Sequence, residues 1–143
     1  MTNQPVPSMI RGVVAVIVNE GRLLVIRRSS QVRAPGMYCF PGGEIEPGEE
    51  EEQTLRREVR EELAVEVLPI GRIWTSVTSW GVELAWWQAE LPRDSQPVAN
   101  PDEVESWQWC TVAQMRAIAD LLPSNEAFLD ALANGVFTLP GME

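Results

Sequence analysis

The stretch Gly43–Val65, GEIEPGEEEEQTLRREVREELAV, predicts a helix that carries a cluster of carboxylates. Leu55, Val59 and Leu63 recur every fourth residue and form one apolar stripe, which is typical of a helix packed on a core. Acidic residues crowd the first turn after Pro47-Gly48, where the positive end of the helix dipole favours them. We therefore expect a helix over the second half of this stretch, with one face buried.

Glu58, Glu61 and Glu62 lie on one patch of this helix, because residues three and four apart are neighbours on a helical surface. Like charges at this spacing destabilise an isolated helix by about 0.2–0.5 kcal/mol per pair, and burial strengthens the repulsion. A cation bound among the carboxylates would remove it. The alternative is a solvated acidic face. Pairing of Arg57 with Glu61 on such a face would leave Glu58 and Glu62 without a helical partner.

The same stretch resembles the signature of the Nudix hydrolase family, which reads Gly, five residues, Glu, seven residues, Arg-Glu-apolar-any-Glu-Glu-any-Gly-apolar. The matching residues are Gly43, Glu49, Arg57, Glu58, Val59, Glu61, Glu62 and Val65. The departure is Ala64, where the family has glycine. Glycine closes a helix in a left-handed turn more easily than alanine, so the helix exit is in question, but no ligand is lost.

The resemblance implies an α/β/α sandwich with a mixed β-sheet and a hydrolase that cleaves diphosphate linkages with Mg²⁺, or with Mn²⁺ in its place. It covers roughly Ile10 to Ala133, within one domain over residues 1–143. It implies that Glu58, Glu61, Glu62 and the carbonyl of Gly42 bind the metal, and that these glutamates serve catalysis with Arg57. Arg57 is expected to orient a box carboxylate such as Glu49.

Three residues outside the box gain roles from the resemblance to MutT-like members. Glu103, six residues before Trp109, is expected to add a metal ligand, with Asp102 and Glu105 as rivals. Glu103 and Glu61 are both candidates for the base that takes the proton of the attacking water.

Arg28 and Asn125 are the expected substrate-binding residues. Arg28 ends a predicted strand and offers phosphates a planar donor fork, although a solvated strand end is the simpler interpretation. Asn125 is expected to hydrogen-bond a purine, since an amide offers a donor and an acceptor together. A helix cap is the commoner role for such a residue.

The composition narrows the chemistry. The chain has 143 residues, a formal net charge of −10 and no histidine, which excludes histidine catalysis and the common zinc sites. Oxygen ligands remain, and these suit magnesium or manganese. An acidic protein is a poor partner for nucleic-acid polymers, so a small nucleotide substrate is expected.

Location follows from the cysteines and the apolar runs. Cys39 and Cys110 imply no disulfide framework, so a reducing cytoplasm is expected. No apolar run approaches the ~18–20 residues of a membrane span, and the N-terminus MTNQPVPSMIRG shows no export pattern. The oligomeric state stays open, a homodimer included.

The remaining elements follow from periodicity and turn residues. Trp86 and Trp87 must face opposite sides of their strand. Thr111 is a plausible cap for a helix after the strand that holds Trp109. The expected strands are Ile10–Val18, Leu23–Arg28, Tyr38–Phe40, Val65–Trp74 and Val82–Leu91. Pro41–Gly43 follows the third strand, and its adjacent glycines favour a backbone that approaches a ligand closely, with a plain turn as the alternative. Pro92–Pro101 is expected as a loop, Asn125–Ala133 as a helix capped by Ser124 or Asn125, and Phe137–Glu143 as a loose tail.

Three functions are open at this point. The first is MutT-like hydrolysis of a nucleoside triphosphate to a monophosphate and pyrophosphate. The second is hydrolysis of ADP-ribose or a nucleotide sugar, although the family's usual proline marker is missing from Thr78–Gly81. The third is a nucleotide-sensing module without catalysis, which the complete set of box carboxylates disfavours.

Overall fold

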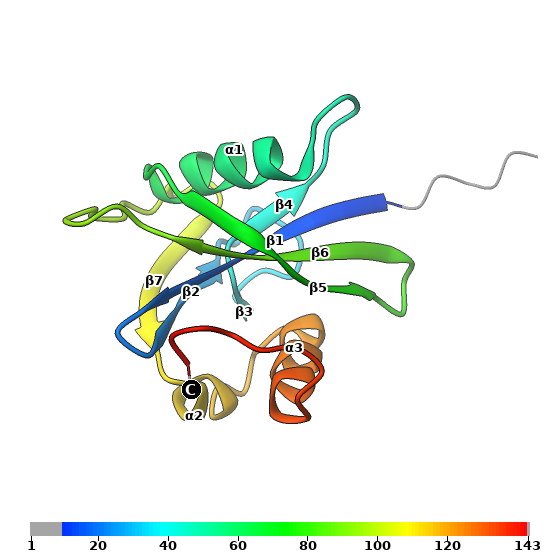
Figure 1. Ribbon diagram of the computed structural model, residues 1–143. Helices are drawn as coiled ribbons and strands as arrows, with labels where there is room; N and C mark the ends of the chain where they lie inside the picture. Colours follow the sequence, from blue (N-terminus) through cyan, green and yellow to red (C-terminus); the bar gives the residue numbers. More distant parts are fainter. Residues whose placement is uncertain (1–9, 143) are drawn as a thin grey trace, which may run out of the picture.

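Seven strands and three helices make up the described part of the protein, residues 10–142 of a computed structural model (Figure 1). The strands are β1 (Ile10–Asn19), β2 (Arg22–Arg28), β3 (Tyr38–Cys39), β4 (Gly42–Glu44), β5 (Leu68–Val77), β6 (Val82–Glu90) and β7 (Val104–Cys110). The helices are α1 (Glu51–Leu63), α2 (Val112–Arg116) and α3 (Pro123–Ala133).

Strand β1 organises the sheet. It runs parallel to β6 and antiparallel to β4, and it meets β2 only at the hairpin end, where Val18 pairs with Leu23. β5 extends the β6 side, whereas β3 and β7 both pair with β2. The sheet is therefore mixed, and helices cover both of its faces: α1 lies on one side, and α2 and α3 lie on the other (Figure 1). The expected α/β/α architecture is confirmed.

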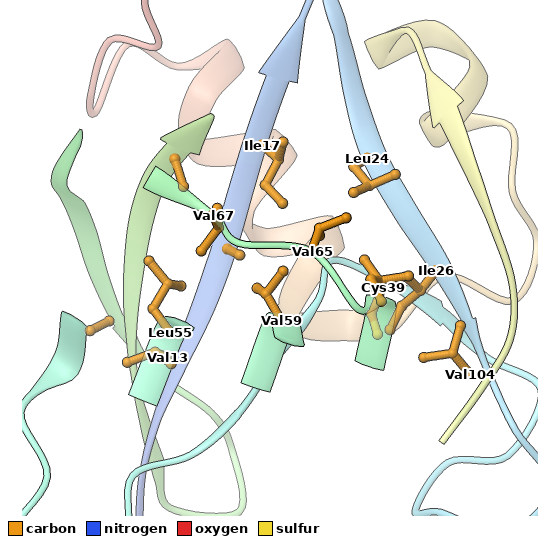
Figure 2. Packing of buried hydrophobic residues seen from close by; sticks show 14 residues of the cluster. Val13, Ile17, Leu24, Ile26, Cys39, Leu55, Val59, Val65, Val67 and Val104 are labelled. Carbon is orange, nitrogen blue, oxygen red and sulfur yellow. The ribbon is translucent and has the colours of Figure 1, made fainter. Parts of the chain in front are cut away.

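The apolar stripe of α1 packs on the sheet as predicted. Leu55, Val59 and Leu63 are fully buried, and Figure 2 shows Leu55 and Val59 among the side chains of the sheet and the segment that follows α1. Burying a side chain of this size contributes about 1.5–3 kcal/mol. The stripe therefore fixes which side of α1 is left for the carboxylates.

Aromatic side chains fill the opposite face. Trp86 is fully buried and stacks on Phe128 of α3 with ring centroids 4.8 Å apart. Trp87 lies on the α1 side, where its indole N–H donates to Glu51 at 2.8 Å. The prediction that these two tryptophans face opposite ways is confirmed.

Both ends of α1 have defined caps. Glu50 and Gln53 form a capping box at the start. At the end, Ala64 takes the left-handed conformation (φ 56°, ψ 34°) and its N–H donates to the carbonyl of Arg60. The helix thus closes in the turn that glycine would make, and the alanine Cβ bears the strain.

Replacing Ala64 with glycine is expected to raise the free energy of unfolding by about 1 kcal/mol, because glycine enters the left-handed region without a Cβ clash. Urea unfolding at neutral pH measures the change. Ala117→Gly is the matched control, since Ala117 ends α2 in the right-handed region (φ −81°) and glycine gains nothing there. An Ala64→Gly variant no more stable than the parent contradicts the strain.

Several expected boundaries were wrong. β5 begins at Leu68 and ends at Val77, whereas Val65 and Val67 lie buried between the helix and the strand. The alternative of a plain turn at Pro41–Gly43 does not hold, because Gly42–Glu44 pairs with β1 as β4, a strand that was not predicted. The last helix begins earlier than expected, at Pro123 with Leu122 as its cap, so neither Ser124 nor Asn125 caps it. Proline suits this first helical position because its missing N–H has no helical partner there.

The C-terminal segment is ordered through Met142, against the expectation of a loose tail. Leu139 is buried, and the side-chain amide of Gln88 donates to the carbonyl of Pro140 at 3.0 Å. Phe137 packs against Phe128, with ring centroids 5.0 Å apart. Glu143 lies outside the described residues.

Thr111 caps α2 as predicted, accepting from the Gln114 N–H at 3.1 Å. None of the helices within residues 10–142 is long and apolar enough to cross a bilayer. The expectation about the N-terminus rests mainly on residues 1–9, which lie outside the described part of the chain.

Candidate active site

Glu62 lies against the β3–β4 segment. Only 6% of the residue is exposed, and its Oε1 accepts from the N–H of Gly42 at 2.9 Å. Two backbone hydrogen bonds to β1 lie on either side of Gly42. The Ala15 N–H donates to the Pro41 carbonyl before it, and the Ile45 N–H after it donates to the Arg11 carbonyl. By the alternation of an antiparallel ladder, the N–H and carbonyl of Gly42 both face away from β1. The Gly42 carbonyl therefore lies on the Glu62 side of the strand.

The two glycines of β4 allow close approaches on different sides of the strand. A Cβ at Gly42 would lie 2.2 Å from the carbonyl oxygen of Val13, a backbone contact of β1 that a larger residue could not keep. A Cβ at Gly43 would lie 2.2 Å from the carboxyl carbon of Glu58, so a larger residue there would push this side chain away. Gly43 therefore leaves the room in which the Glu58 carboxylate lies against β4.

The structure brings Glu103 to the same cluster. Its charge contributes to raising the pKa of both Glu58 and Glu62, and its Oε2 is buried without a hydrogen-bond partner among the described residues. The two rivals lie elsewhere: Asp102 is exposed, and Glu105 forms an ion pair with Arg27 at 3.4 Å. Of the three, Glu103 is the one that faces the box.

Burial dominates the electrostatics of the cluster. It raises the pKa of Glu58 to about 7, with the charges of Glu61 and Glu103 adding to it against the opposing charge of Arg57. Burial also raises the pKa of Glu62 well above its ordinary value, and it raises that of Glu103. These carboxylates are therefore hard to ionise together without a cation.

A divalent metal fits this donor set. The Glu103 Oε2 is buried without a hydrogen-bond partner among the described residues, and Glu58 and Glu62 are both partly or fully withdrawn from water. A bound cation would stabilise the ionised forms of these carboxylates, and their hard oxygen donors suit Mg²⁺ or Mn²⁺. Among residues 10–142, no three side chains of the metal-binding types already converge as a coordination shell.

Arg57 connects the box residues. Its guanidinium donates to both oxygens of Glu49 at 2.8 and 2.9 Å, to Glu58 at 2.9 Å and to the carbonyl of Glu44 at 3.1 Å. Glu61 lies 3.4 Å away, as a helical pair. The contacts with Arg57 lower the pKa of Glu49 to about 2. The expected contact between Arg57 and Glu49 is therefore present.

Thr54 is a residue that sequence reasoning missed. It is fully buried, and its hydroxyl donates to Glu49 Oε1 at 2.9 Å. The only signal in the sequence is a hydroxyl residue one helical turn ahead of Glu58, on the inner face of the helix. Thr54 and Arg57 together fix the Glu49 carboxylate.

Arg28 lies beside the cluster, at the end of β2. Its positive charge lowers the pKa of Glu62, opposing burial, and its Nη1 lies 3.8 Å from the Cys39 sulfur. Burial raises the pKa of the Cys39 thiol to about 11 although Arg28 opposes the shift. The Arg28 guanidinium therefore lies at the edge of the carboxylate cluster and provides a positive charge that could bind an anion there.

Asn125 is not part of the carboxylate cluster. Only 3% of it is exposed, its Oδ1 accepts from the Phe40 N–H at 3.0 Å, and its Nδ2 donates to Ser124 at 3.3 Å. It connects α3 to the Phe40–Gly42 segment, whose other end contacts Glu62. In this structure Asn125 holds the fold next to the site, and reading of a base by its amide stays a prediction.

Without divalent metal, stability is expected to fall as pH rises from about 4.5 to about 7. The folded pKa of Glu58 lies above its ordinary value, so the folded state binds more protons than the unfolded state within this window. Glu58 alone accounts for a fall on the order of 2 kcal/mol. Urea unfolding across this pH range tests it, and saturating Mg²⁺ should flatten the slope. Glu58→Gln should make the slope shallower without removing it, because the pKa values of Glu62 and Glu103 are also raised, and an unchanged slope in that variant contradicts the assignment.

Comparison with known proteins agrees with this geometry. The NUDIX domain family matches residues 9–132. The CTP pyrophosphohydrolase of Escherichia coli is 43% identical over 59 residues, 41% of this chain and 44% of that protein. The NAD-capped RNA hydrolase NudC of Stutzerimonas stutzeri is 33% identical over 112 residues, 78% of this chain and 38% of that protein. The matches therefore span less than half the length of these two curated relatives.

Solved structures share the fold. The solution structure of the E. coli ORF135 protein superposes with a TM-score of 0.70 and 26% identity, covering 93% of this chain and 96% of that one. The MutT protein of Methanosarcina mazei gives a TM-score of 0.73 at 21% identity, covering 89% and 94%. With the family match over most of its length, the chain belongs to the Nudix family.

Proposed function

We propose that this protein hydrolyses a diphosphate linkage in a nucleoside triphosphate, giving a nucleoside monophosphate and pyrophosphate, with Mg²⁺ as cofactor and Mn²⁺ as a substitute. The observation that supports it best is the cluster of the buried Glu62 with the half-buried Glu58 and Glu103, of which Glu103 has an oxygen without a hydrogen-bond partner among the described residues. Such a cluster beside Arg28 suits a metal-bound polyphosphate.

The proposed metal ligands are the carboxylates of Glu58, Glu61, Glu62 and Glu103 and the carbonyl of Gly42. When bound, the metal neutralises phosphate oxygens and lowers the pKa of water. Glu62 is held for this role by the Gly42 N–H. Glu61 is about half exposed at the rim, at 47% of its side chain.

Two arginines support the ligands in different ways. Arg57 contacts Glu49, Glu58 and Glu61, so it positions carboxylates and has few donors left for substrate. Arg28 lies at the edge of the cluster and is proposed to bind a phosphate of the substrate, because a guanidinium offers paired donors to phosphate oxygens.

A carboxylate of the site must take the proton of the attacking water. Glu103 and Glu61 are the candidates, since neither is held by a backbone donor as Glu62 is. Burial and the charge of Glu61 raise the pKa of Glu103, which makes its carboxylate a stronger base than a free one. Water then attacks one of the two phosphorus atoms of the α–β linkage, and the phosphate on the other side leaves with the bridging oxygen, which gives the monophosphate and pyrophosphate.

The base is proposed to lie towards α3. A small cleft of about 160 Å³ separates the β5–β6 turn from the start of α3, and Trp80 and Ser124 line it. Ser124, which accepts a hydrogen bond from the Asn125 amide, supports this proposal because it lines the cleft, although Asn125 itself does not. Trp80 is 61% exposed and offers a ring face for stacking.

Substrate class is inferred from relatives. The 43% identity over 59 residues to a protein named CTP pyrophosphohydrolase favours a nucleoside triphosphate. The relatives named NAD-capped RNA hydrolase support a second candidate, the diphosphate linkage of NAD or of an NAD-capped RNA end.

A substrate panel with Mg²⁺ tests these proposals. It contains canonical and oxidised nucleoside triphosphates, ADP-ribose, nucleotide sugars, NAD and NAD-capped RNA, with Glu62→Gln as the inactive control. Pyrophosphate and a monophosphate from a triphosphate are the expected products. Release of AMP from ADP-ribose would replace the triphosphate proposal with hydrolysis of ADP-ribose or a nucleotide sugar. Release of AMP from NAD would replace it with hydrolysis of NAD or an NAD-capped RNA end. Nucleotide binding without turnover of any substrate would identify a sensing module.

A further inference from the structure

A second cleft lies outside the carboxylate site. It has a volume of about 450 Å³ and is bounded by the β1–β2 turn, by the segment that follows β6 and by β7. Its walls include Trp107 and Trp109, and none of the proposed metal ligands or substrate-binding residues line it. The volume lies in the range of small-molecule sites.

The two tryptophans present ring surface to this cleft from one face of β7. They are two residues apart, so their side chains point the same way. Their partners across the ladder, Ile26 and Leu24, are buried on the α1 side of the sheet. Both indoles are half-buried. Two half-buried indoles are thus available on the same wall.

The rim of the cleft is acidic. Glu20, Glu90 and Asp94 line it with Arg93 as the opposing charge, which gives a formal local charge of −2. Within residues 10–142, none of these four side chains takes part in an ion pair. Arg93 forms no cation–π contact with either indole, since the one such contact of the described residues joins Arg27 to Tyr38.

We propose that this cleft binds a small organic cation with two positive charges, such as an aliphatic diamine. Ring faces attract ammonium groups that shed part of their hydration, and unpaired carboxylates complement the charge. A hard metal ion is a poorer match, because the rim carboxylates are exposed to water and the indoles beside them offer it no oxygen donor. The proposal stands whether or not the protein hydrolyses a triphosphate.

Putrescine is the probe, and 1,4-butanediol is its uncharged counterpart of the same length. The titration uses the full chain with saturating Mg²⁺, so that the carboxylates of the candidate active site are occupied. The readout is the indole N–H resonance of Trp107 and Trp109, assigned through Trp→Phe variants. Saturable shifts of these two resonances by putrescine, in the millimolar range or tighter, and none by butanediol are expected.

Variants separate the ring and charge contributions. Trp107→Ala and Trp109→Ala should each weaken binding about tenfold. Trp80→Ala, which removes an exposed indole elsewhere, should leave it unchanged. Glu90→Gln and Asp94→Asn should each weaken it about threefold, whereas Glu126→Gln on α3 should not. If an alanine variant fails to fold, a leucine keeps the apolar volume and still lacks the ring.

Three results would overturn the proposal. They are equal shifts from butanediol, unchanged affinity in both tryptophan variants, and shifts confined to the amide of Gly42 and its neighbours. The last would mean that the diamine binds the active-site carboxylates alone. A lysine whose α-amino and α-carboxyl groups are both blocked tests whether the bound cation belongs to a protein side chain. If this probe binds more tightly than putrescine, the proposed ligand becomes a lysine side chain of a protein instead of a diamine.

Discussion

Glu62→Gln is expected to lower turnover at least tenfold while the fold stays intact. Glutamine keeps an oxygen that can accept from the Gly42 N–H, so the local contact survives. It removes the buried negative charge, which the proposed metal requires. In the absence of metal, the variant should be at least as stable as the parent, because a buried carboxylate is hard to keep ionised.

The measurement is steady-state turnover of the best substrate of the panel, with urea unfolding alongside. Glu52→Gln is the matched control, since it makes the same substitution on an exposed side chain of the same helix. The control should keep its activity. Full activity in Glu62→Gln, or Mg²⁺ affinity equal to that of the parent by calorimetry, would remove Glu62 from the proposed metal site.

Arg57→Ala has the second-largest expected effect. The substitution removes both guanidinium hydrogen bonds to Glu49, which keeps only those from Thr54 and the Glu46 N–H, and it leaves Glu58 without its counter-charge. We expect a loss of stability of about 2 kcal/mol and a turnover at least tenfold lower, because the carboxylates lose their positions. Arg57→Lys keeps the positive charge but loses the paired N–H donors of the guanidinium. Its stability and its turnover should therefore lie between those of the parent and those of Arg57→Ala.

Two measurements distinguish positioning from a general loss of fold. Arg60→Ala removes an exposed arginine of the same helix that pairs with Glu66, and it should leave the unfolding midpoint nearly unchanged. In Arg57→Ala the pKa of Glu49, followed by NMR, should rise from about 2 towards its ordinary value near 4.5. A Glu49 pKa that stays low would show that Arg57 is not its main partner.

The helix and its carboxylates were predictable because they depend on local spacing. The stripe of Leu55, Val59 and Leu63 and the patch of Glu58 and Glu62 each follow from one helical period. The mixed sheet followed from the family resemblance, since strand pairing across the chain leaves no local trace. Glu103 was reached through its offset from Trp109, and its role stays a prediction.

The misplaced elements depend on tertiary contacts. β4 exists because β1 offers a free edge beside two glycines that a local reading takes for a turn. The C-terminal segment is ordered because Phe137 and Leu139 meet an aromatic face that forms only in the folded sheet. Asn125 was placed at a helix start because its own preference is for caps, whereas Pro123 starts the helix earlier.

The buried thiol of Cys39, beside Arg28, can report the local opening of β3, the strand next to the candidate active site. Cys39 is 4% exposed and its pKa is about 11, so little reactive thiolate reaches a sulfhydryl reagent while the sheet is closed. Alkylation therefore requires a transient local unfolding of β3, and its rate measures how often that strand separates from β2. Anything that tightens the neighbouring cluster should slow the labelling of this one sulfur.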